Sequence, residues 1–228
     1  MAEPLKVNYT YTGDVAEAKK LLSELPAVVA CDFEAASKIK PDRRAYLTDR
    51  AARAGISVAY RNKLLQSLNA TGLSHPSLVD ITHFSCAWSP TDSLVIVTDT
   101  PEMRAMLYEW LVTTTVKQIW HNAGFDFKHI RYATGKIPIN FEDTQLLAKV
   151  LLNDANNFKA QTGLKGLMGY AYTSFWKDLA DGFAPKDPYD EDFIHYAAID
   201  ACATFKLWYD MQLHPRMEGT TPELVFEC

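Results

Sequence analysis

An uninterrupted apolar run leads directly into two acidic residues in the sequence Ala27-Val28-Val29-Ala30-Cys31-Asp32-Phe33-Glu34. A continuous run of this kind is typical of a strand that is buried on both faces of a sheet. Because side chains alternate along a strand, Asp32 and Glu34 point to one face and Phe33 points to the other. The sequence therefore predicts a buried central strand that ends in two neighbouring carboxylates.

Signals for helices and strands alternate on both sides of this strand. Asp14 and Glu17 form a capping-box pattern before a helix that ends at Pro26, and Thr100 precedes a helix with Pro101 at its first position. The other expected elements are strands over 81–88, 94–98 and 118–120, and helices over 123–134 (stopped by Gly135), 142–152, 164–171 and 190–213. A hairpin combined with strand-to-helix crossovers predicts an α/β fold with a mixed central sheet flanked by helices.

The composition is that of one globular domain. The 228 residues are 48% hydrophobic and 22% charged, which excludes an intrinsically disordered chain. No stretch approaches the roughly 18 uncharged apolar residues that a membrane span requires, and the N-terminus lacks a signal sequence, so we expect a cytoplasmic protein without membrane contact. The cysteines are far apart in the sequence, which predicts reduced thiols at Cys31, Cys86, Cys202 and Cys228.

Charge is distributed unevenly along the chain. From Lys38 to Lys63, eight basic residues accompany two acidic ones, so this segment carries +6, while the total of −5 leaves −11 for the remainder. We interpret residues 38–76 as a basic helical insertion into a core of about 14–37 and 77–213, followed by a linker-like tail over 214–228. A basic segment on an acidic body fits a protein that holds phosphates in one place and cations in another, although a solvated helix would carry the same charges.

Two further elements carry acidic residues that could join Asp32 and Glu34. Asp126 follows a short apolar strand, and Asp200 lies four residues after Tyr196 on the last helix, so the phenol and the carboxylate share one helix face. Like charges collected beside a buried strand must be protonated, paired or bound to cations. Oxygen ligands suit Mg²⁺ or Mn²⁺ rather than zinc, and two such ions about 4 Å apart would support phosphodiester hydrolysis.

In this order the residues resemble the three motifs of the DnaQ-like, RNase H-like 3′-5′ exonucleases of the DEDDy branch, with Asp32-x-Glu34, Asn122-x-x-Phe125-Asp126 and Tyr196-x-x-x-Asp200. Residues 195–204 resemble the third motif of the proofreading exonuclease domain of family A DNA polymerases. Asp32-Phe33-Glu34-Ala35 is similar to the first motif of the phage members of that family. The resemblance covers about residues 14–213 and implies an RNase H-like fold.

The resemblance also implies roles for individual residues. It implies two Mg²⁺ or Mn²⁺ ions held by four carboxylates, those of Asp32, Glu34, Asp126 and Asp200. Tyr196 would orient the attacking water, whereas His195 stands at the spacing of a related branch in which a histidine is the general base. We favour Tyr196, because a residue at i, i+4 lies nearly over the aspartate and one at i, i+5 is rotated by about 140°.

Several other residues are candidates for binding the substrate or supporting the site. Asn122 and Phe125 would contact or support the nucleotide, and Lys165 could reach a phosphate. Asp143 is interpreted as a helix cap, with direct metal binding as the alternative, and both Asp143 and His195 could support the metal ligands. The basic insertion adds four arginines that could guide DNA: Arg43, Arg44, Arg50 and Arg53.

These roles imply a hydrolase that removes nucleotides from single-stranded 3′ ends of DNA and releases 5′-mononucleotides, as in proofreading during DNA replication. At 228 residues the chain is too short to include a polymerase, so we expect a stand-alone phage-like exonuclease or the exonuclease part of a split or truncated family A polymerase. A separate polymerase subunit would then be a partner, and a phage-encoded protein would act in the host cytoplasm. The alternatives are an RNase D-like RNA exonuclease and a non-catalytic nucleic-acid-binding or polymerase-docking module.

The basic insertion gives a first testable prediction. Replacing Arg43, Arg44, Arg50 and Arg53 together by Gln should weaken DNA binding and flatten its salt dependence, because fewer counterions are released from the phosphates. Fluorescence anisotropy of a labelled single strand over a salt series measures this slope. Metal affinity should not change, and an unchanged salt slope would contradict a DNA-guiding role.

Overall fold

The computed structural model describes residues 5–37, 54, 55, 57, 59, 76–152 and 187–213. Its centre is a six-stranded sheet in the order β1-β4-β3-β2-β5-β6. The strands are β1 (Asn8–Thr12), β2 (Val28–Ser37), β3 (Val79–Ala87), β4 (Asp92–Val97), β5 (Lys117–Trp120) and β6 (Phe141–Asp143). β3 pairs antiparallel with both of its neighbours and the other pairings are parallel, so the sheet is mixed, as predicted.

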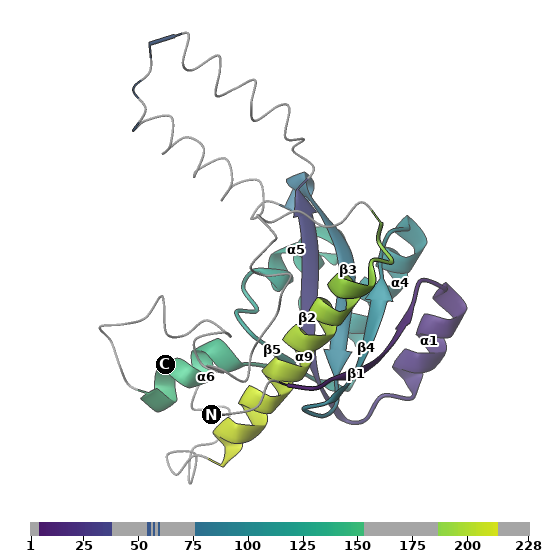
Figure 1. Ribbon diagram of the computed structural model, residues 1–228, viewed down its shortest axis with the longest axis vertical. Helices are drawn as coiled ribbons and strands as arrows, with labels where there is room; N and C mark the ends of the chain where they lie inside the picture. The colour runs from purple at the N-terminus through teal and green to yellow at the C-terminus, as the bar shows by residue number, and fades with distance from the viewer. Residues whose placement is uncertain are drawn as a thin grey trace.

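Helices cover both faces of the sheet (Figure 1). They are α1 (Val15–Ser23), α4 (Pro101–Thr113), α5 (Asp126–Thr134), α6 (Thr144–Leu152) and α9 (Glu191–Gln212), with a short 3-10 helix, η1 (Pro76–Leu78). The main core lies between the sheet and α1, α4 and α5, where Leu22, Leu107 and Ile130 pack against strand residues. α9 crosses the opposite face, where Ile194 packs against Val95 of β4. The sheet is therefore the middle layer of three.

Side chains along β2 point alternately to the two helical layers on either side of the sheet. Val29, Cys31 and Phe33 belong to the core shared with α1, α4 and α5. The intervening side chains of Asp32 and Glu34 therefore face α9. The predicted sharing of one face by the two acids is confirmed, since Asp32 and Glu34 offer oxygens to the same group of carboxylates.

Helix ends follow the signals in the sequence, with one difference. The Thr100 side chain accepts the Met103 N–H at 3.1 Å, and Gly135, at φ 74°, ends α5 in the left-handed conformation. The Asp14 side chain caps α1 by accepting the Glu17 N–H at 2.8 Å. The Glu17 carboxylate accepts the Thr12 hydroxyl at 2.5 Å, so only half of the expected capping box forms.

Three strands differ from the expectation. β1 lies before residue 14, where the predicted core began, and its side chains are mostly exposed, so it lacks the apolar signal of a buried strand. Phe141–Asp143 forms β6, and the helix expected from 142 begins at Thr144, because three residues are too few to show a period. β2 continues to Ser37, so Asp32 and Glu34 lie within the strand and not at its end.

Part of the predicted organisation lies outside the described residues: most of the insertion over 38–76, the helix over 164–171 and the tail over 214–228. Cys31, Cys86 and Cys202 are buried free thiols, as predicted, and Cys228 also lies outside the described part. Within the described ranges, no helix combines the length and the apolar character needed to cross a lipid bilayer.

A buried charge connects α9 to the far edge of the sheet. Glu142 of β6 is 8% exposed and accepts the Trp208 Nε1–H of α9 at 2.6 Å. The other oxygen of the same carboxylate forms an ion pair with Lys117 of β5. Trp208 therefore fixes the C-terminal half of α9 to two strands through one carboxylate.

Replacing Trp208 by Phe should lower the free energy of unfolding by about 1.5 to 3 kcal/mol, because a hydrogen bond to a charged, buried group is lost. Urea unfolding followed by far-ultraviolet circular dichroism measures the change. Tyr209→Phe is the matched control, since Tyr209 is 51% exposed and should change stability little. An equal effect of both substitutions would show that the bond to Glu142 contributes nothing.

Candidate active site

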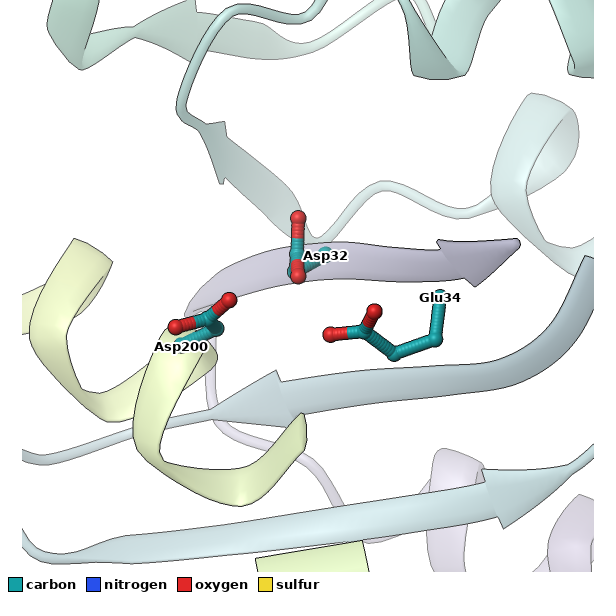
Figure 2. Close-up of side chains that lie close together, drawn as sticks. All are labelled: Asp32, Glu34 and Asp200. Carbon is teal, nitrogen blue, oxygen red and sulfur yellow. The ribbon is translucent and has the colours of Figure 1, made fainter. Parts of the chain in front are cut away.

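Three carboxylates meet on the α9 face of the sheet. Asp32 and Glu34 from β2 and Asp200 from α9 each offer one oxygen, and these oxygens all lie within 4.8 Å of one another. Figure 2 shows the side chains of Glu34 and Asp200 turned toward the space beside Asp32. Two elements that are far apart in the sequence thus build one acidic cluster, which we call the triad.

Small residues on α9 let the helix come close to the strands. Ala197 and Ala198 pack with Val95 of β4, and Ala201 packs with Ala87 of β3. All three alanines are fully buried. Short side chains permit a close approach of the helix axis to the sheet, which brings Asp200 within reach of β2.

Asp126 extends the triad from a third element. It is the first residue of α5 and is 2% exposed. Burial raises the pKa of Asp126 well above its usual value, the negative charges of Asp32 and Asp143 raise it further, and hydrogen bonds from the backbone amides of Asp126 and Phe33 oppose the rise. Asp126 therefore lies close enough to Asp32 for the two charges to repel.

The four carboxylates fit divalent cations. The triad brings three oxygens together, and Asp126 Oδ1 is buried without a hydrogen-bond partner among the described residues. A buried carboxylate oxygen without a donor is costly unless a proton or a cation satisfies it. Oxygen-only donors suit Mg²⁺ or Mn²⁺, so the residues present match the chemistry of such ions.

The two candidates for orienting water lie on different sides of α9. His195 is exposed, and its ring centroid lies 5.6 Å from that of Tyr9 in β1, the edge strand farthest from β6. Tyr196 is half-buried, and its ring lies 5.7 Å from that of Phe193. The structure therefore places His195 toward β1, whereas Tyr196 lies one turn before Asp200.

Two of the predicted nucleotide contacts, Asn122 and Phe125, lie just before Asp126 in the chain. Asn122 is exposed and has a φ of 63°, and Phe125 is half-buried with its ring centroid 5.1 Å from that of His129. Asp143 accepts the Gln145 and Leu146 amides at 2.8 and 3.3 Å at the start of α6, in agreement with a helix cap. The other predicted contacts, Lys165, Arg43, Arg44, Arg50 and Arg53, lie outside the described residues.

Sequence reasoning missed His83, which holds the beginning of α9 beside the triad. His83 pairs with Glu34 in the sheet and is fully buried, which lowers its pKa. Its Nε2 lies 2.7 Å from Pro188 O, and since a carbonyl only accepts, Nε2 carries the proton. A single histidine in an apolar strand gives no signal for this contact, which spans 105 positions of the chain.

The fold is shared with solved nucleases. The chain superposes on the EXO domain of Nibbler from Aedes aegypti with a TM-score of 0.64 and 12% identity, covering 99% of each chain. For Escherichia coli RNase D, an exoribonuclease involved in structured RNA processing, the TM-score is 0.60 at 14% identity, covering 97% of this chain and 49% of that one. For NrnC of Brucella melitensis with bound Mg²⁺, the values are 0.55 and 14%, covering 98% and 87%.

This likeness defines the class of the fold. The mixed sheet between two layers of helices is the RNase H-like fold of the DnaQ-like exonucleases, as the sequence motifs implied. The chain spans about half the length of RNase D. No protein-family model matches the sequence, and no curated protein shows detectable sequence similarity to it. The likeness at this low identity therefore concerns the fold alone.

The ionised carboxylate of Asp126, which would bind a cation, should lower the stability of the metal-free protein because it is buried. The unfolded state loses the Asp126 proton near pH 4, at a lower pH than the folded state, whose pKa is raised. The metal-free protein should therefore lose stability as the pH rises through that interval. Asp126→Asn should remove this loss and raise stability near neutral pH by about 1 to 2 kcal/mol.

Urea unfolding in EDTA at several pH values tests this expectation. Asp210→Asn is the control, because the Asp210 side chain is 50% exposed and lies about 15 Å beyond Asp200 along α9, so the pH dependence of this variant should stay close to that of the unchanged protein. If Asp126→Asn is no more stable than the unchanged protein near neutral pH, Asp126 does not carry a destabilising charge.

Proposed function

We propose that this chain is a metal-dependent 3′-5′ exonuclease. The observation that supports the proposal is the triad, in which the oxygens of Asp32, Glu34 and Asp200 lie within 4.8 Å of one another on an RNase H-like sheet, with Asp126 buried beside them. Carboxylates from separate elements that converge in this way are suited to holding the cations that phosphodiester hydrolysis requires.

Each residue has a role in this proposal. Asp32, Glu34, Asp126 and Asp200 would hold two divalent ions, Mg²⁺ or Mn²⁺, which supply positive charge for the attacking water and the leaving oxygen when bound. Tyr196 orients the water through its hydroxyl, since the usual pKa of a phenol is too high for it to act as a base near neutral pH. The water oxygen bonds to phosphorus, the bond from phosphorus to O3′ breaks, and a proton lost by the water is balanced by the proton that O3′ takes up, so that a 5′-mononucleotide and a shortened strand with a 3′-hydroxyl are released.

The substrate we propose is the single-stranded 3′ end of DNA. The similarity of residues 195–204 to the third motif of polymerase proofreading domains supports DNA and a proofreading context in replication, with a separate polymerase subunit as a partner. The similarity of Asp32-Phe33-Glu34-Ala35 to the first motif of the phage members supports a phage-like protein that acts in the host cytoplasm. RNA is the second candidate, because the fold is also that of RNase D, an exoribonuclease.

The experiment compares a 5′-labelled single-stranded DNA with an RNA of the same sequence, each incubated with Mg²⁺ or Mn²⁺. A ladder that shortens from the 3′ end, depends on metal and disappears with Asp200→Ala supports the exonuclease. Faster shortening of the RNA would assign the chain to RNA trimming. Absence of cleavage by the folded, metal-bound protein would contradict the proposal and favour a non-catalytic binding module.

Two neighbouring substitutions test which side chain orients the water. Tyr196→Phe should lower kcat by about 10- to 100-fold with little change in KM, because a misplaced water reacts slowly while the strand still binds. His195→Gln should leave kcat nearly unchanged, since His195 is exposed beside Tyr9. Steady-state kinetics on the preferred strand measure both variants, and the reverse result would assign the role to His195.

A further inference from the structure

One buried carboxylate joins the turn that follows β5 to the first turn of α6. Asp143 is the last residue of β6 and is 6% exposed. Besides the two amides of α6, it accepts the Asn122 N–H at 3.1 Å and the Ala123 N–H at 2.9 Å. A cap of α6 alone would need only the amides of Gln145 and Leu146. The other two amides, those of Asn122 and Ala123, belong to the turn that follows β5.

This turn leads the chain into α5 and Asp126. Asn122 has a φ of 63°, in the left-handed region, which costs most residues with a side chain about 1 to 2 kcal/mol and which Asn adopts more readily than most. The Phe125 N–H then bonds to Asn122 O at 3.0 Å, and α5 begins at Asp126 without a side-chain cap of its own. Asp143 thus supplies from another strand the acceptors that hold the turn in this left-handed conformation.

Thr144 strengthens the same connection. Its hydroxyl donates to Trp120 O at 3.1 Å, at the end of β5. Because that proton is used, the Thr144 oxygen accepts from His121 Nδ1 at 2.8 Å. Asp143 and Thr144 together contact the backbone or side chain of every residue from Trp120 to Ala123.

The electrostatic effects on an acid at this position are opposed, because the N-terminus of α6 favours a negative charge while the neighbouring Asp126 does not. The charge of Asp143 works against ionisation of Asp126, the neighbouring carboxylate that would bind a cation. A neutral amide side chain would avoid this repulsion, but in place of Oδ2 it would turn an NH₂ group, which is a donor, toward the Ala123 N–H. Oδ1 accepts three of the four amides and Oδ2 accepts the fourth, so the arrangement of these amides explains why a carboxylate stands at this position.

We propose that Asp143 is a positioning residue, which fixes the turn at Asn122 and Ala123 so that Asp126 stands beside the triad. The proposal deepens the proposed function, since it rests on a divalent-ion site that includes Asp126. Asp143 itself touches neither the ion nor the substrate. Its loss should displace Asp126 while leaving Asp32, Glu34 and Asp200 in place.

Mn²⁺ binding to the folded protein, measured by isothermal titration calorimetry, provides a test that does not depend on activity. Asp143→Asn should weaken Mn²⁺ binding by about 10- to 100-fold, the usual loss when a residue that supports metal ligands is replaced. The matched control is Glu142→Gln, a buried neighbour that contacts Lys117 and Trp208 and should lose stability without losing Mn²⁺ affinity. Unchanged affinity in Asp143→Asn would overturn the proposal.

A second substitution examines the route through the turn. Asn122→Gly, added to Asp143→Asn, should recover part of the lost Mn²⁺ affinity, because glycine adopts a positive φ without help. A double variant no better than Asp143→Asn would contradict this route. If Asp143→Asn does not fold, hydrogen exchange of the unchanged protein decides: slow exchange at Asn122 and Ala123 supports the proposal, and the rate of an exposed amide overturns it.

The outcomes separate this inference from the proposed function. If Mn²⁺ binds and depends on Asp143 while neither DNA nor RNA is cleaved, the exonuclease proposal fails and the positioning role stands. If the strands are cleaved and Asp143→Asn binds Mn²⁺ as tightly as the unchanged protein, only the positioning role fails.

Discussion

The site depends on holding negative charges together against their mutual repulsion. Two ionised carboxylates about 5 Å apart repel by roughly 3 kcal/mol at an effective dielectric constant of about 20. The triad contains three such pairs within 4.8 Å, and Asp126 adds its repulsion with Asp32. If all of these carboxylates stayed ionised without cations, this energy would be comparable to the net stability of a whole domain. The surrounding structure must therefore keep α9 and β2 together by other contacts.

Those contacts lie at both ends of α9 and on the opposite side of the sheet. Pro188, ahead of the helix, accepts a hydrogen bond from His83, and Trp208, near its end, donates one to Glu142. Asp200 lies between these two anchors, where Ala201 packs on β3. Behind β2, Phe33 packs against Trp120, so an apolar core also fixes the strand. Repulsion in the triad therefore acts on elements that cannot easily separate.

The sequence could predict the elements that carry strong, local signals. The apolar run of β2, the Thr100 cap and the Gly135 stop each depend on neighbouring residues, and the structure contains all three. β1 and β6 could not be predicted, because an exposed edge strand and a three-residue strand show too little periodicity. The bonds of His83 to Pro188 and of Asp143 to Asn122 were also beyond reach, since they join residues 105 and 21 positions apart.

The directions in which His195 and Tyr196 point depend on the rotation of α9 about its axis, which packing sets. Consecutive residues of a helix differ in direction by about 100°. Ala197 and Ala198 face β4 and Ala201 faces β3, so the rotation of α9 is fixed by fully buried side chains. Turning His195 from Tyr9 to the position of Tyr196 would also turn these alanines out of the core and Asp200 away from the triad. The packing that brings Asp200 to Asp32 and Glu34 thus keeps the imidazole on the other side of the helix.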